Sequence, residues 1–142
     1  MSNTHRTIIT VDIKKGGNAV GLITIDLRSR KLIYEQIVDN VKEQVVREVL
    51  KENDYLPSVR SLANELGINP NTIQKAYAEL ERQGIIHSVA GRGCIVVATA
   101  DTVRGMLHGK IGAKVAELAE EARTSGMTYE EFCAAAKAAF EE

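Results

Sequence analysis

The residues best suited to chemistry in this sequence lie on one predicted helix, and they are side chains that recognise other molecules. The inward-facing positions, which recur at helical spacing, are Ile73, Ala76, Tyr77 and Leu80. Asn71, Gln74 and Lys75 then point outward. The amides of Asn and Gln match the edge of a base, adenine best, and Lys reaches a phosphate or a guanine. This face predicts contacts with DNA.

Local signals make this helix the second of a pair that is joined by a tight turn. Ser58 follows a proline and is expected to cap a first helix, which Gly67 ends by adopting a positive φ. Asn69-Pro70 is a capping residue followed by proline at the first helical position, and Gly84 ends the second helix. Two helices joined by so short a turn are a helix-turn-helix.

A predicted β-hairpin follows the second helix. Two runs rich in β-branched residues, 85–89 and 94–97, flank the reverse-turn signal Ala90-Gly91-Arg92-Gly93. An arginine between two glycines at a hairpin tip has little bulk around it and suits a minor groove or a phosphate. Taken alone, the segment fits an ordinary surface turn equally well. Behind a helix-turn-helix, it is predicted to be a wing.

An amphipathic segment before this motif predicts a further helix. Its apolar face is expected to comprise Tyr34, Ile37, Val38, Val41, Val45 and Val49. Its polar face is expected to comprise Glu35, Lys42, Glu43 and Arg47. This helix would lie across the helix-turn-helix and complete a three-helix core.

Residues 98–142 predict two more helices, the first ended by Gly126 and the second begun by a capping box at Thr128. They contain too few large apolar residues to form a core of their own. Their apolar stripes must therefore be buried on a partner, and we expect a second copy of the chain. The residues expected at this dimer interface are Leu107, Ile111, Val115, Leu118, Phe132 and Phe140.

These motifs resemble a known family. The run LPSVRSLANELGINPNTIQKAYAELERQGII followed by GRG is similar to the winged helix-turn-helix of GntR-type bacterial transcription regulators, over Asp26 to Val97. The chain departs from the family pattern at Glu52-Asn53, where Pro-Gly is usual, and at Leu32, where proline is frequent. The resemblance implies that DNA is contacted by Arg60, Asn71, Thr72, Gln74, Lys75, Gly91 and Arg92. The short helical tail resembles the YtrA type of the family, in which the tail dimerises and no large effector domain follows.

Composition excludes several other classes of protein. A chain of 142 residues with 44% hydrophobic content predicts one small domain plus appendages, and a net charge of −1 argues against a protein that coats DNA. Cys94 and Cys133 match no metal or redox spacing, the three histidines form no ligand set, and no nucleophile–base pair is apparent. We therefore expect no metal, no cofactor and no enzymatic activity. Neither a membrane-spanning run nor a signal peptide is visible, so we expect a cytoplasmic protein with no membrane partner.

The predicted fold is mainly α with a small β-hairpin. It comprises an N-terminal extension (1–26), a winged helix-turn-helix domain (27–97) and a two-helix dimerisation tail (98–142). The predicted function is a homodimeric, sequence-specific regulator, expected to be a repressor, with its recognition helices in successive major grooves of a pseudo-palindrome. The resemblance implies an operator near the regulator's own gene, often beside genes for an ATP-driven transporter.

Two alternative functions remain open at this point. One is a plasmid replication or partition protein with the same winged fold. The other is a protein-interaction module whose wing binds a protein partner. The sequence identifies neither the DNA sequence of the operator nor a small-molecule effector.

Residues 1–26 carry two opposed predictions. The runs Thr7–Ile13 and Leu22–Leu27 favour a pair of strands. Because such a pair alone is marginal in water, it would have to pack on the DNA-binding domain. Alternatively, Lys14-Lys15-Gly16-Gly17 has the composition that a translated ribosome-binding sequence would encode, and the chain made in the cell would begin at Val20. The physical support for this second hypothesis is that residues 1–19 show little hydrophobic periodicity and so have little to bury.

Overall fold

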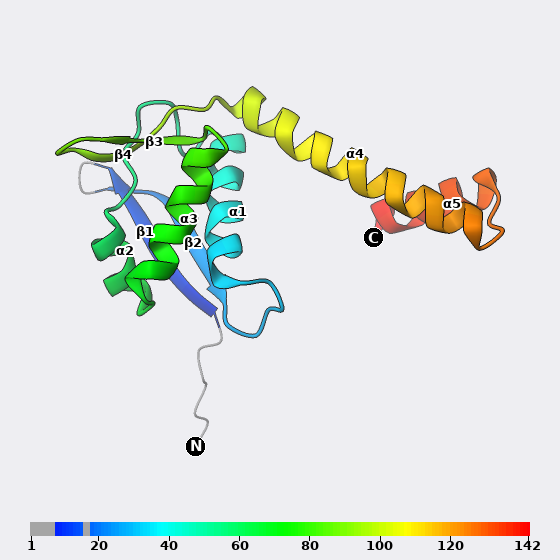
Figure 1. Ribbon diagram of the computed structural model, residues 1–142, viewed down its shortest axis with the longest axis horizontal. Helices are drawn as coiled ribbons and strands as arrows, with labels where there is room; N and C mark the ends of the chain where they lie inside the picture. Colours follow the sequence, from blue (N-terminus) through cyan, green and yellow to red (C-terminus); the bar gives the residue numbers. More distant parts are fainter. Residues whose placement is uncertain (1–7, 16–17) are drawn as a thin grey trace, which may run out of the picture. The chain divides into compact units, whose positions relative to one another are not determined.

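A computed structural model describes residues 8–15 and 18–142, and its chain divides into two units that meet between Arg104 and Gly105 (Figure 1). The elements of the first unit are β1 (Ile8–Lys15), β2 (Asn18–Asp26), α1 (Ile33–Val46), α2 (Val59–Leu66), α3 (Pro70–Arg82), β3 (Ile86–Val89) and β4 (Gly93–Val96). Helix α4 (Ala100–Thr124) begins in the first unit and continues into the second, which also holds α5 (Tyr129–Glu141).

Helices α1, α2 and α3 form the expected three-helix core of the first unit. Both α1 and α2 pack on α3. The core is aliphatic, and its fully buried side chains include Ile37, Val41, Leu62, Ile73 and Leu80. The prediction of a helix-turn-helix backed by a first helix is confirmed.

The sequence prediction for α1 is wrong at two points. The helix ends at Val46, and Glu48 adopts a left-handed φ of 58°, so Val49 lies beyond the helix. Lys42, expected on the solvent face, is only 7% exposed because α3 packs on that side of α1. The pKa of the Glu79 carboxyl on α3 is lowered mainly by hydrogen bonds from Arg82 and Gln83, and the positive charge of Lys42 makes a smaller contribution to the same shift.

The N-terminal strands form an antiparallel hairpin that packs on the helices: β2 contacts α1 and β1 contacts α2. Every second residue faces inward, and Val11, Ile13, Ile23 and Ile25 are all buried. Residues 1–7 and 16–17, including Thr7 and the Gly-Gly pair, lie outside the described residues. The argument that residues 1–19 have little to bury is therefore wrong, because β1 supplies two side chains to the core.

Two amide side chains on α1 hold the edge of β2 that faces away from β1. Asn40 accepts a hydrogen bond from the Thr24 backbone N–H (3.1 Å) and donates one to the Thr24 carbonyl (2.9 Å). One turn earlier, Gln36 accepts from the Asp26 N–H (2.8 Å) and donates to the Asp26 carbonyl (3.0 Å). Each amide thus makes the pair of hydrogen bonds that a residue of a neighbouring strand would make.

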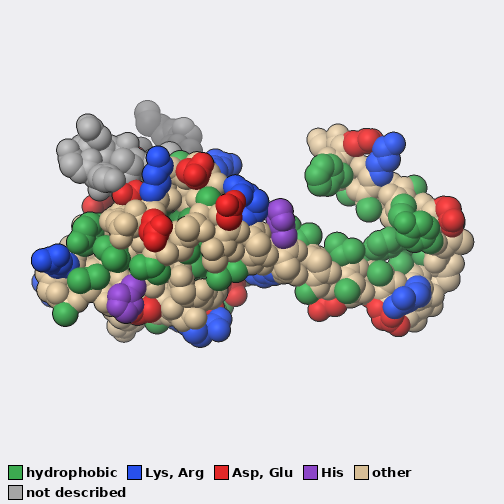
Figure 2. Space-filling view, turned by 90° about the horizontal axis from the view of Figure 1, so that it is seen from above, with side chains coloured by type: hydrophobic (Ala, Val, Ile, Leu, Met, Phe, Trp, Pro, Cys, Tyr) green, Lys and Arg blue, Asp and Glu red, His purple; other side chains and the backbone are tan. Residues whose placement is uncertain are grey.

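The second unit is a pair of helices with no core of its own. The capping box predicted at Thr128 is present, and Gly126 adopts a φ of 81° after the end of α4. Helix α5 has no buried residue, and the one buried residue of α4, Val103, belongs to the first unit. Figure 2 shows hydrophobic side chains along both helices of the second unit. These apolar surfaces are accessible in a single chain.

Candidate nucleic-acid interface

The turn between α2 and α3 is built from the local signals that the sequence carries. The Ser58 hydroxyl accepts a hydrogen bond from the Ser61 N–H (3.1 Å), and Gly67 ends α2 with a φ of 65°. The Asn69 side chain accepts from the Asn71 N–H (2.9 Å), and Pro70 is the first residue of α3. These caps fix where the two helices begin and end. The burial of Ile73, Ala76, Tyr77 and Leu80 then determines which face of α3 points outward.

Tyr77 ties α3 to the start of α2. Its ring is buried, and its hydroxyl donates a 2.6 Å hydrogen bond to the carbonyl of Pro57. Burial raises the pKa of the Tyr77 hydroxyl above its ordinary value, with a smaller contribution from Cys94, so this hydroxyl stays protonated and keeps its role as donor. The outward face of α3 is therefore presented by a helix that is anchored from within.

The predicted recognition residues lie on α3 as expected. Asn71, Gln74 and Lys75 are exposed, and Thr72 is half-buried. In the part of the chain that the structure describes, the side-chain amides of Asn71 and Gln74 have no intramolecular hydrogen-bond partner. Each can therefore use its donor and its acceptor together on one base edge.

Lys75 is positioned by a residue that the sequence reasoning did not assign to the interface. Its ammonium group lies over the ring of Tyr34, 4.1 Å from the ring centroid. Such a cation–π contact at an exposed site is worth about 0.5–1 kcal/mol. Tyr34 was expected only to face the core, and nothing in the spacing of α1 and α3 indicates that its ring meets Lys75.

Arg60 and Arg92 supply the remaining predicted cations. Arg60 is exposed in the first turn of α2, and Arg92 is exposed between β3 and β4. Gly91 and Gly93, on either side of Arg92, have φ values of 73° and 90°, which a residue with a side chain rarely adopts. No carboxylate of the described residues forms an ion pair with either arginine. Both charges are therefore available to a ligand.

The wing is more than a two-stranded hairpin, because the segment before α2 pairs with its second strand. Tyr55 forms a bridge with Ile95, and the Leu56 N–H donates to the Cys94 carbonyl (2.9 Å). Glu52-Asn53, the point of departure from the family pattern, leads into this pairing, with Asn53 at a φ of 71°. Asn at that position can take the left-handed conformation that a glycine would take.

The described residues offer recognition chemistry, namely amides, hydroxyls and cations on accessible surfaces. Across residues 8–15 and 18–142, no three His, Cys, Asp or Glu side chains are grouped so as to hold a metal ion. Within the same residues, no helix has the length and apolar content that crossing a membrane requires.

Comparison with known proteins agrees with this geometry. Residues 33–96 match the family of bacterial regulatory proteins of the gntR type. The chain is 47% identical over 90 residues to the HTH-type transcriptional repressor YtrA of Bacillus subtilis, covering 63% of this chain and 68% of that protein. The chain belongs to the GntR family.

Two further relatives support the YtrA-like assignment within the GntR family. The regulator YhcF of Bacillus subtilis is 39% identical over 105 residues, which cover 73% of this chain and 86% of that protein. The structure of YtrA from Sulfolobus acidocaldarius, a GntR-family transcription factor, is 40% identical and superposes with a TM-score of 0.54 over 66% of this chain and 97% of that one. As a GntR protein, the chain is a DNA-binding transcription regulator and not an enzyme. Of the functions that the sequence left open, family membership supports the regulator.

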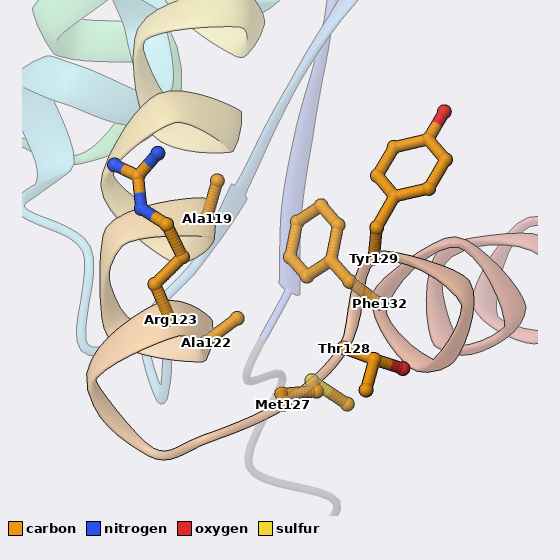
Figure 3. Close-up of a pocket in the computed structure, with 7 residues that line it drawn as sticks. All are labelled: Ala119, Ala122, Arg123, Met127, Thr128, Tyr129 and Phe132. Carbon is orange, nitrogen blue, oxygen red and sulfur yellow. The ribbon is translucent and has the colours of Figure 1, made fainter.

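The second unit presents a different kind of surface. Residues of α4 and α5 line a mostly apolar hollow of about 180 Å³, shown in Figure 3, with Ala119 and Ala122 on one side and Phe132 on the other. Val115 and Leu118 of α4, two of the predicted interface residues, line a neighbouring hollow together with Phe132 of α5. Ile111, Val115 and Leu118 are 58%, 47% and 54% exposed. On α5, Phe140 is 95% exposed, and Leu107 of α4 is half-buried. The second unit thus presents large apolar side chains that are accessible in a single chain.

Proposed function

We propose that the protein is a homodimeric repressor that binds a pseudo-palindromic operator, with residues 27–97 as the DNA-binding domain and residues 98–142 as the dimerisation tail. The observation that carries the dimer is the exposed apolar surface of the second unit. Within the second unit α4 and α5 fully bury no side chain, so the two helices gain little from packing on each other alone. A second copy offers the same surface in self-complementary form, which a two-fold axis requires.

The proposed DNA contacts follow from the accessible side chains of the first unit. Asn71, Gln74 and Lys75, with Thr72 beside them, read base edges and phosphates in the major groove. Arg60 binds at the start of α2, and the Gly91-Arg92 tip of the wing enters the minor groove or holds a phosphate. Because two such readers act together, the operator has two half-sites about one helical turn apart or somewhat more.

The setting of this activity is also a proposal. Because the partner is genomic DNA, we place the protein in the cytoplasm. Its resemblance to YtrA-type regulators favours an operator beside its own gene, together with genes for an ATP-driven transporter.

The first experiment is selection of bound sequences from random duplex DNA by the full-length protein, followed by footprinting. We expect a motif of two inverted half-sites. A single asymmetric half-site bound with full affinity would contradict the proposed dimeric reading of DNA.

The dimer is tested separately with a matched pair of substitutions in α4. Leu118→Glu places a charge on the apolar stripe, whereas Ala116→Glu places the same charge on the opposite side of the helix, since successive residues are turned by about 100°. Sedimentation should show monomers for Leu118→Glu and dimers for Ala116→Glu. A dimer that survives Leu118→Glu would move the interface away from the tail.

A further inference from the structure

The wing is held along both of its outer edges. Ser88 of β3 lies opposite Cys94 of β4, and the backbone groups of both residues point away from the hairpin. On the β4 side, the preceding segment supplies the partners: the Asn53 N–H donates to the Val96 carbonyl (2.7 Å), and the Val96 N–H donates to the Asp54 carbonyl (2.8 Å). This edge is paired as in a sheet.

On the β3 side, the partner is a side chain of the recognition helix. Glu81, in the last turn of α3, accepts a hydrogen bond from the Ser88 N–H through Oε1 (3.0 Å). The Ser88 hydroxyl donates to Oε2 of the same carboxylate (3.4 Å), and His87 Nδ1 lies 3.5 Å from Oε1. One carboxylate therefore meets two consecutive residues of β3.

The contact continues to the wing tip through a single residue. Val89 follows Ser88, and its carbonyl accepts a 2.9 Å hydrogen bond from the Arg92 N–H, which closes the turn. Two hydrogen bonds, at Ser88 and at Arg92, thus link the end of α3 to the backbone that carries the Arg92 side chain. A change in the orientation of β3 on α3 would move Arg92 with it.

We propose that Glu81 is a positioning residue that fixes the wing relative to the recognition helix, so that α3 and Arg92 engage DNA in one geometry. This inference rests on the proposed wing contact with DNA. A wing that samples other orientations lowers the apparent affinity by the fraction of time it spends outside the competent one. A hydrogen bond to a charged acceptor, 41% of whose side chain is exposed, is strong enough to bias that distribution without locking it.

Because Glu81 is negatively charged, the loss of its charge and the loss of its positioning role should change the affinity for DNA in opposite directions. Removing a carboxylate from a DNA-binding domain normally strengthens binding, because it removes a repulsion with the phosphates. Glu81→Gln removes the charge but keeps an oxygen that can accept from the Ser88 N–H. Glu81→Ala removes both. If the positioning role of Glu81 dominates, Glu81→Ala lowers the affinity for DNA, whereas Glu81→Gln leaves it unchanged or raises it.

Binding is measured with the full-length protein and the duplex recovered by the selection experiment. Glu81→Ala should weaken binding by roughly 2- to 12-fold. This factor corresponds to the usual net strength of one hydrogen bond, because solvent screens the charge of a carboxylate that is 41% exposed. Glu81→Gln should bind as tightly as the wild type or more tightly, as should Glu65→Ala, which removes an exposed carboxylate from α2. In an Arg92→Ala background, Glu81→Ala should cause no further loss, because the side chain that it positions is gone.

Two results would overturn the inference. One is an affinity of Glu81→Ala equal to that of Glu81→Gln, and the other is an undiminished effect of Glu81→Ala in the Arg92→Ala background. If Arg92→Ala alone binds as tightly as the wild type, the proposed wing contact fails instead. Hydrogen exchange at the Ser88 amide then decides the role of Glu81 without DNA: protection should fall in Glu81→Ala and persist in Glu81→Gln and in Ser88→Ala. A Ser88 amide that stays protected in Glu81→Ala would show that the hydrogen bond to Glu81 does not hold β3 in place.

Discussion

The N-terminal hairpin should contribute measurably to stability, and two isoleucines on one strand make the test. Ile13 is 0% exposed, whereas Ile8 on the same strand is 57% exposed. Truncating a fully buried isoleucine to alanine costs about 2–5 kcal/mol, through lost burial and the cavity left behind. The same truncation at Ile8 should change the free energy of unfolding by about 0.5 kcal/mol or less.

The expected difference is large compared with the stability of a small domain, which is about 5–15 kcal/mol. With a urea dependence of about 1–3 kcal/mol per M, a loss of 3 kcal/mol lowers the unfolding midpoint by about 1–3 M. Urea unfolding followed by the near-ultraviolet circular dichroism of tyrosine reports on the first unit, because Tyr77 is buried there. Equal, small effects at Ile13 and Ile8 would refute the reasoning that β1 belongs to the core.

This test also bears on the alternative start at Val20. A chain beginning there lacks β1 and leaves the inward face of β2 without its neighbour, so it should unfold at a lower urea concentration than the full chain. The intact mass of the protein from its native host shows directly which chain the cell makes.

Three further predictions concern single side chains. Gln36→Ala removes two hydrogen bonds with the backbone of Asp26 and one to the Lys31 carbonyl, at a 9%-exposed position, and should cost about 2–4 kcal/mol in urea unfolding; a change below 0.5 kcal/mol would contradict the proposed edge contact. Arg60→Ala should weaken operator binding by about 1–3 kcal/mol and relax specificity at one position, and unchanged binding in a gel-shift titration would make Arg60 structural. The Arg82 hydrogen bond holds the pKa of Glu79 at about 2, below its ordinary 4.5. The ionised Glu79 carboxylate therefore stabilises the folded state fully above pH 4.5, and this contribution is lost as the pH falls toward 2. Glu79→Gln should therefore flatten the pH dependence of unfolding in that window, and an unchanged slope would dismiss the contribution of Glu79.

The helix-turn-helix is predictable because the residues at the ends of its two helices are typical capping residues. Ser58, Gly67 and the Asn69-Pro70 pair each act on the backbone within a few residues, so the sequence alone places both helices and their outward faces. The same holds for the turn around Arg92, where two glycines supply the positive φ values. Family resemblance then added Arg60, which no local pattern singles out.

The contacts that the sequence did not predict join elements far apart in the chain. Burial of Lys42 depends on how α3 lies on α1, and the contact of Lys75 with Tyr34 depends on the same packing. The sequence predicts the strand pair of β1 and β2, and its packing on the DNA-binding domain is one of two hypotheses. The sequence does not indicate that α1 and α2 supply the packing surface. Periodicity shows that a face is apolar, whereas only the assembled fold shows what covers that face.

The amide side chains of Gln36 and Asn40 have a consequence for the behaviour of the protein in a crowded solution. A strand edge with free N–H and carbonyl groups is a template on which a strand of another molecule can add, and such additions lead to aggregates. At Thr24 and Asp26 those groups are already occupied by side chains from α1. A helix thereby ends the growth of a sheet at this edge, and it does so with two neutral amide side chains and without a third strand or a proline.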